Sequence, residues 1–170
     1  ATPEVQSMAA SLAARLGLRN TPEVRESDEI EAPQVTGFLR ATVLLPGRWL
    51  ARFTGDELAM TLCHELAHVR RHDLLLGAVP ALAERIFFFH PLARLAAREY
   101  ALAREAACVQ AVLDCLGAAP RDYGRLLLRL GVRRDDIGLA AAGSSPSVHA
   151  LRRRLDMLHQ ASLATRARRL

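Results

Sequence analysis

The sequence predicts an α+β domain that is rich in helix and carries one small sheet of about three strands, antiparallel or mixed. Long stretches repeat apolar residues three and four positions apart, as amphipathic helices do, whereas residues 23–45 form short β-branched or alternating runs. A chain of 170 residues, half of them apolar, is long enough to bury one core. We therefore expect a single domain over residues 1–170.

The first two helices follow from periodicity and from the residues that cap them. Residues 4–16 repeat apolar side chains at helical spacing, and Gly17 behind them suits a C-terminal cap. Thr54-Gly55-Asp56-Glu57 has the form of a capping box, in which Thr54 and Glu57 cap the helix reciprocally. This predicts a helix from there to about His72.

The later helices are bounded by proline and glycine. Pro91 suits the first turn of a helix, and His90 before it suits a cap. Gly117 and Gly131 suit helix ends. The predicted helices are 73–88, 91–116, 120–130 and, after a loop at 143–146, a last one from Ser147.

The predicted sheet lies between the first two helices. Its strands are separated by Pro33 and Gly37, and Pro46-Gly47 ends the last of them. The runs concerned are 24–30, 35–40 and 42–45.

Composition excludes some classes of function. The formal charge of +5 favours acidic partners or an anionic membrane surface, and every basic residue is an arginine. The arginines are dispersed until the C-terminal tail and aromatic residues are few, so we expect no nucleic-acid binding. Three cysteines without a Cys-x-x-Cys pair favour reduced thiols in a cytoplasmic compartment.

No segment resembles a membrane span or a leader. A spanning helix needs roughly 18 apolar residues, and the nearest candidate, Leu74 to Phe89, is interrupted by Pro80, Glu84 and Arg85. We interpret it as a buried helix. The start at Ala1 shows no signal peptide, and we expect the chain to be a domain of a longer protein.

The run His64-Glu65-Leu66-Ala67-His68 lies on the predicted helix from Thr54 and carries the chemistry. Two histidines four residues apart share one helix face, where both imidazoles can reach one Zn²⁺ at about 2.0–2.1 Å. Glu65 lies about 100° around the helix from His64 and can act as the catalytic base on a water that a metal activates. The run therefore predicts a zinc-dependent peptidase.

A catalytic zinc needs a third protein ligand, which must come from another element. His72 shares the face, but eight residues of helix span about 12 Å, too far for one metal. The H-E-x-x-H-x-x-G-x-x-H pattern is ruled out by Arg71 and Leu74. Periodicity does not choose between Glu99 and Glu105, and the chemically possible ligands are Glu99, Glu105, Cys108, Asp114 and His149.

Several motifs together resemble the BlaR/MecR family of antirepressor metallopeptidases, the protease modules of β-lactam sensor-transducers. They cover residues 5 to 160 approximately, and the spaced set is much more specific than H-E-x-x-H alone. The motifs are Leu62-Cys-His-Glu-Leu-Ala-His-Val-Arg-Arg-His-Asp73, Phe89-His-Pro-Leu92, Arg104-Glu-Ala-Ala-Cys108, Ala32-Pro-Gln-Val-Thr-Gly-Phe38, Val43-Leu-Leu-Pro46 and Leu151-Arg-Arg-Arg-Leu155.

The resemblance implies a compact gluzincin fold with one zinc ion and Glu105 as its third ligand. It also implies that the strand around Val35 to Arg40 lies at the sheet edge, where Gly37, Phe38 and Leu39 would contact an extended substrate. The substrate would be a protein, either a transcriptional repressor or the transducer itself. The parent would be anchored in a bacterial inner membrane with this module on the cytoplasmic side. A membrane quality-control protease of the HtpX-like type is the alternative enzyme.

One position departs from the family pattern. Family members usually carry an aspartate four residues after the glutamate ligand, where this chain has Val109. Loss of a carboxylate behind a ligand histidine can weaken metal binding by roughly ten- to a hundredfold, so a weak or inactive signalling module that only binds a partner is a further alternative. Asp73 or a backbone carbonyl would replace the missing group. Cys63 and Cys108 are expected to be packed thiols.

Overall fold

The computed structural model describes residues 1–135, and the side chains of residues 1–129. The predicted loop at 143–146 and the helix from Ser147 lie outside the described residues. The chain divides into two compact units, Ala1–Leu116 and a second one from Gly117 onward. The expectation of one domain over residues 1–170 stays a prediction.

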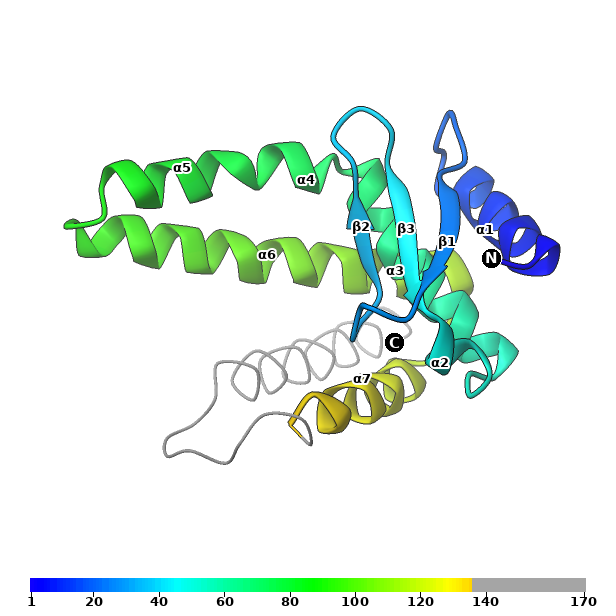
Figure 1. The fold of residues 1–170 in the computed structure, drawn as a ribbon. Helices are drawn as coiled ribbons and strands as arrows, with labels where there is room; N and C mark the ends of the chain where they lie inside the picture. Colours follow the sequence, from blue (N-terminus) through cyan, green and yellow to red (C-terminus); the bar gives the residue numbers. More distant parts are fainter. Residues whose placement is uncertain (136–170) are drawn as a thin grey trace, which may run out of the picture. The chain divides into compact units, whose positions relative to one another are not determined.

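The first unit is helix-rich with one small sheet, which confirms the predicted α+β class (Figure 1). Most predicted helices are found within a few residues of their expected bounds. The elements are α1 Pro3–Arg15, β1 Glu23–Ser27, β2 Gln34–Thr36, β3 Thr42–Pro46, α2 Gly47–Leu50, α3 Gly55–Arg70, α4 Asp73–Leu76, α5 Ala78–Ile86 and α6 Pro91–Leu116, with α7 Pro120–Asp135 in the second unit.

The caps read from the sequence account for several boundaries. The Thr54 hydroxyl accepts a hydrogen bond from the Glu57 backbone N–H, and the Glu57 carboxylate accepts one from the Thr54 backbone N–H. The predicted capping box at the start of α3 is therefore present. Gly17 follows α1 with a φ of 75°, and Gly117 follows α6 with a φ of 62°. The prediction that Gly131 ends α7 is wrong, because the helix continues to Asp135. A glycine inside a helix costs only about 1 kcal/mol relative to alanine, which neighbouring turns can offset.

The sheet is mixed, with the strand order β1-β3-β2. β1 pairs parallel with the central β3, and β2 pairs antiparallel with it, placing Val35 opposite Val43. The predicted strand 35–40 is wrong beyond Thr36, because Gly37 turns the chain with a φ of 87°. The predicted strand 24–30 likewise ends at Ser27.

The core forms where α3 contacts α1, α6 and strands β2 and β3. Alternate residues of β3 and one stripe of α3 point into this core, as their two periodicities require. Fully buried side chains there include Val43, Leu45, Leu62, Leu66 and Val112. These contacts on several sides hold α3 in place, and they thereby fix the positions of the residues on its remaining face.

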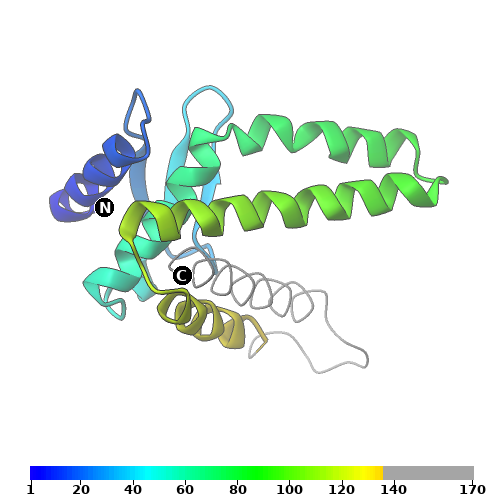
Figure 2. The same cartoon turned by 180° about the vertical axis from the view of Figure 1, so that it is seen from behind.

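Helices α4 and α5 form one arm of a hairpin whose other arm is the first half of α6 (Figures 1 and 2). The chain turns between Phe87 and His90, and His90 Nδ1 accepts from the Leu92 N–H at 3.3 Å, which is the predicted capping role. The prediction of a buried helix here is wrong, because α5 contains no buried residue. Its apolar stripe gave the expected periodicity, but among the described residues its large side chains stay exposed.

None of the described helices is both long enough and apolar enough to cross a membrane.

Candidate metal centre

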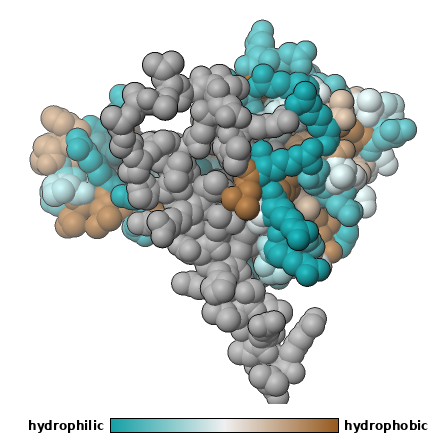
Figure 3. All heavy atoms as spheres, turned by 90° about the horizontal axis from the view of Figure 1, so that it is seen from below, coloured by the Kyte–Doolittle hydropathy of each residue, from teal (hydrophilic) through white to brown (hydrophobic). Residues whose placement is uncertain are grey.

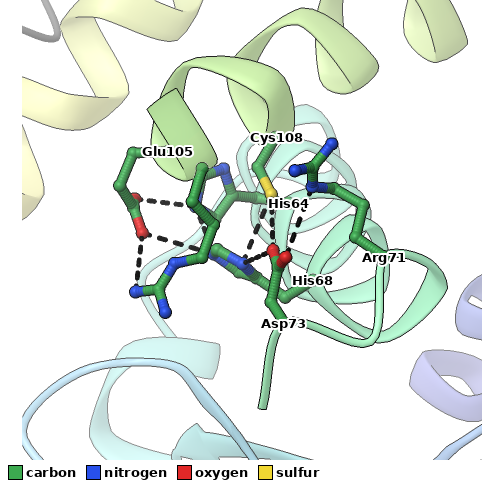
Figure 4. A network of polar contacts seen from close by, with 7 residues as sticks. His64, His68, Arg71, Asp73, Glu105 and Cys108 are labelled. Atoms are coloured by element: carbon green, nitrogen blue, oxygen red, sulfur yellow. Dashed lines mark hydrogen bonds and ion pairs between the residues drawn. The ribbon is translucent and has the colours of Figure 1, made fainter. Parts of the chain in front are cut away.

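His64 and His68 project from the same face of α3, as their spacing predicts (Figure 4). Their Nε2 atoms are 3.2 Å apart, and their rings are nearly perpendicular, with an interplanar angle of 83°. Both side chains are mostly buried, with 12% and 15% of their surface exposed. Two ring nitrogens converging on one point in this way can bind a single cation.

Glu105 on α6 completes this group. Its Oε2 lies 3.6 Å from His64 Nε2 and its Oε1 lies 3.6 Å from His68 Nε2. One ligand atom from each of the three residues lies within 4.8 Å of the others. Packing of α6 against α3 makes this contact, which joins residues 41 and 37 positions apart in the sequence.

The other proposed third ligands lie elsewhere or outside the described residues. Glu99 is exposed on α6 and is absent from the ligand groups of the described chain. Asp114 accepts a hydrogen bond from the Gln110 amide at 2.8 Å. His149 is not among the described residues. The structure thus brings Glu105 to the histidines and does not bring Glu99, a choice that periodicity left open.

Asp73 lies behind His68. Its Oδ2 is 2.8 Å from His68 Nδ1, and the aspartate is 3% exposed (Figure 4). Because a carboxylate only accepts, the proton lies on Nδ1 and the lone pair of Nε2 faces Glu105. Asp73 therefore supplies the carboxylate behind a ligand histidine that Val109 cannot supply. It is one of the two substitutes that the sequence predicts.

The end of α3 explains how Asp73 reaches this position. On a continuous helix, a residue five positions after His68 would lie about 140° away from it. The predicted helix to His72 is wrong, because α3 ends at Arg70 and His72 adopts a left-handed conformation with a φ of 55°. This residue turns the chain, so that α4 begins at Asp73 and its side chain returns to His68.

Burial and neighbouring charges set the electrostatics of the site. Burial, followed by the proximity of His64, lowers the pKa of His68, which favours the neutral imidazole that a metal requires. Arg104 Nη2 lies 3.5 Å from Glu105 Oε1, and Arg71 Nε lies 3.4 Å from Asp73 Oδ1. Each arginine thus forms an ion pair with a carboxylate of the site. Nothing in the sequence pattern marks these two among the 23 arginines, so neither was predicted.

The two expected packed thiols are buried. Burial raises the pKa of Cys108 to about 12 and raises the pKa of Cys63 as well, so both stay protonated. Cys108 Sγ lies 3.3 Å from His68 Nδ1 and donates to Asp73 Oδ2 at 3.7 Å. His68, Asp73 and Cys108 form a second cluster of ligand atoms, but the His68–Asp73 hydrogen bond and the protonated thiol explain their proximity.

Glu65 follows His64 on α3, is buried and is 8% exposed. The buried set of two imidazoles, the Glu105 carboxylate and the Asp73 carboxylate fits a zinc ion by the chemistry of its donors. Zinc takes nitrogen and carboxylate oxygen ligands, and a ligand histidine commonly donates its other ring N–H to a carboxylate.

The loop predicted to contact substrate follows the edge strand β2. Gly37, Phe38 and Leu39 lie between β2 and β3 and outside any strand, and Phe38 and Leu39 are 73% and 100% exposed. β2 has a single strand neighbour in the described chain and contacts α3, the helix that carries the histidines. The edge position expected for this strand is therefore present, although its strand residues are Gln34–Thr36.

Comparison with known proteins shows the family of this chain. Residues 3–158 match the family described as BlaR1 peptidase M56. The chain is 30% identical over 129 residues to the regulatory protein BlaR1 of Bacillus licheniformis, covering 74% of this chain and 21% of that protein. It is 31% identical over 65 residues to methicillin resistance mecR1 proteins of Staphylococcus aureus and Staphylococcus epidermidis, covering 38% of this chain and 11% of theirs. This chain belongs to the BlaR1 peptidase M56 family.

Proposed function

We propose that this chain is a zinc-dependent endopeptidase module that cleaves a protein substrate. The observation that carries the proposal is the convergence of His64 Nε2, His68 Nε2 and the Glu105 carboxylate, with Asp73 holding His68 from behind. Three protein ligands are the number that catalytic zinc sites use, and zinc held by these three residues would have room for water or substrate.

His64, His68 and Glu105 would hold the ion, and each contributes a distinct property. When bound, zinc supplies a Lewis acid that polarises a carbonyl and lowers the pKa of water. Asp73 fixes the tautomer and orientation of His68, and Arg104 forms an ion pair with the Glu105 carboxylate. Glu65 accepts the proton of the attacking water and passes it to the amine that leaves.

An extended peptide would pair with the free edge of β2. Main-chain pairing at a sheet edge holds a substrate straight and is indifferent to most of its sequence. β2 is short, with three residues, so Phe38 and Leu39 would add apolar contact beyond it. Replacing both with alanine should raise KM for casein more than it lowers kcat; an equal KM would remove this loop from the substrate site.

The family resemblance supports a substrate and a location for the whole protein. We propose that the substrate is a transcriptional repressor or the parent transducer itself. The parent would be anchored in a bacterial inner membrane, with this module on the cytoplasmic side. The chain spans about one fifth of the length of the Bacillus relative that it matches, so other parts of the parent would supply the anchor and the signal.

Replacing Glu65 with Gln tests the proposal. The variant should retain one zinc per chain and lose cleavage of casein, because the amide cannot accept the proton. Glu29→Gln, which changes an exposed loop carboxylate, serves as the matched control and should cleave normally. Cleavage by the Glu65 variant would refute the assignment of the base. A zinc-loaded wild type that cleaves neither casein nor its parent would point to a partner-binding module.

A further inference from the structure

The hairpin of α4, α5 and the first half of α6 exposes an unusual number of large apolar side chains. They extend from α4 through the turn into α6, and each is between 37% and 70% exposed: Leu74, Leu75, Leu76, Val79, Leu82, Ile86, Phe87, Phe88, Phe89, Leu92 and Leu95. In Figure 3 hydrophobic residues gather at the free end of the hairpin, on the left of the view. In water such a patch is costly, so it marks a surface that contacts something apolar.

The two helices of the hairpin pack through small residues and turn the large ones outward. Between residues 74 and 99, every side chain that is not exposed is small: Gly77, Pro80, Ala83, Ala93 and Ala97. A Cβ at Gly77 would lie 2.7 Å from the Asp73 carbonyl oxygen of its own preceding turn and 3.2 Å from Nη1 of Arg104 on α6, so a larger residue there would be crowded.

This packing is the reverse of what a water-exposed hairpin requires. In water, Leu and Phe fill the interface between helices and small or polar residues face outward. In lipid, small residues let helices approach, and the large apolar residues face hydrocarbon chains. The arrangement therefore favours a lipid surface over a protein partner.

Charge and length indicate how the hairpin would meet that surface. Among the apolar residues, Arg85, Arg94 and Arg98 outnumber the carboxylates of Glu84 and Glu99. Arg94 Nη2 donates to the Phe88 carbonyl at 3.1 Å beside the turn. Arginines can pair with anionic headgroups while apolar side chains enter the boundary below. α4 and α5 have four and nine residues, together about 20 Å of helix, against about 30 Å of bilayer hydrocarbon. Their combined length suits partial insertion.

We propose that the free end of this hairpin, residues 79–95, inserts into the headgroup boundary of an anionic lipid bilayer. Phe87, Phe88 and Phe89 at the turn would enter deepest. Glu105 lies thirteen residues along α6 from Leu92, a distance of about 20 Å on a helix. Insertion would therefore hold the metal centre within about 20 Å of the membrane surface, independently of whether that centre hydrolyses peptides.

Vesicle binding by the purified 170-residue chain tests the proposal. The wild type should sediment with vesicles of phosphatidylethanolamine and phosphatidylglycerol, and less with phosphatidylcholine alone. Phe88→Ser with Phe89→Ser should weaken this partition at least about tenfold. Phe38→Ser with Leu39→Ser removes two apolar side chains that are even more exposed, from another loop, and should leave the partition unchanged. Equal loss in both double variants, or no vesicle binding by the wild type, would overturn the proposal.

A fluorescent probe locates the contact. The chain has one tryptophan, Trp49, which is 7% exposed in the core, so a second one introduced at residue 88 reports the turn. The fluorescence emission of Phe88→Trp should shift to shorter wavelength on anionic vesicles and should be quenched by acyl-brominated lipid. The emission of Phe38→Trp should show neither effect. The proposal would be refuted if the wild type forms a dimer without lipid, the Phe88 and Phe89 double variant is monomeric, and Phe88→Trp shows no blue shift on vesicles. The hairpin would then bind a second copy of the chain.

Discussion

His68 Nδ1 donates a hydrogen bond to Asp73 Oδ2 across 2.8 Å. The bond exists because the left-handed residue His72 ends the helix and returns the next side chain to the site. It leaves Nε2 of His68 as the free nitrogen beside Glu105. The family's usual aspartate is replaced by Val109, and here a carboxylate from a different helix lies behind the histidine.

We expect Asp73→Ala to weaken zinc binding by roughly ten- to a hundredfold, the usual effect of losing a carboxylate behind a ligand histidine. Asp73→Asn keeps an acceptor oxygen but loses the charge, so it should weaken binding less. Competition with a calibrated chelator measures both affinities. Equal affinity in wild type and the alanine variant would show that another group orients His68.

Glu105→Ala should lose its zinc on dialysis, because two imidazoles and water bind zinc less tightly than three protein ligands. The matched variant Glu99→Ala removes an exposed carboxylate from the same helix and should retain a full equivalent. Metal content measured by atomic emission distinguishes the two. The reverse result would make Glu99 the ligand.

The stability of the metal-free protein should fall as the solution becomes acidic. Burial, followed by the proximity of His64, lowers the pKa of His68 in the folded state from its ordinary value of 6.5. As pH falls through 6.5, the unfolded chain binds a proton at this position while the folded chain still resists it, so stability is lost from about 6.5 downward to the folded pKa. Above pH 6.5 both states are neutral, and this contribution does not change.

Urea unfolding at pH 7.5, 6.5 and 5.5 measures this dependence. His68→Gln should reduce the slope, whereas the exposed His90→Gln should preserve it. A slope that is unchanged in His68→Gln would assign the acid sensitivity to other groups.

Gly37→Ala should destabilise the fold more than Gly17→Ala. Both glycines have positive φ values, of 87° and 75°, and an alanine in the left-handed region costs roughly 1–2 kcal/mol. A Cβ at Gly37 would also collide with the Arg40 carbonyl oxygen, whereas a Cβ at Gly17 meets open space. Chemical denaturation of both variants tests this difference, and equal destabilisation would mean that the β2–β3 turn relaxes freely.

Local patterns determined much of this protein. The capping box at Thr54 and Glu57 predicted the start of α3, and Pro91 with Gly117 predicted α6 with its observed bounds. The spacing of His64 and His68 placed both rings on one face before any tertiary contact was known. These features are local, since they depend on helical periodicity and on hydrogen bonds between residues a few positions apart.

Other features were decided only by the tertiary structure. Glu99 and Glu105 lie at similar angles beside the apolar stripe of α6, and only its packing against α3 selects Glu105. The apolar run from Leu74 to Phe89 predicted burial, yet its large side chains are exposed in the part of the chain that the structure describes. Periodicity reports that a helix has an apolar face, but the element that covers the face, or the absence of one, depends on contacts between residues distant in the sequence.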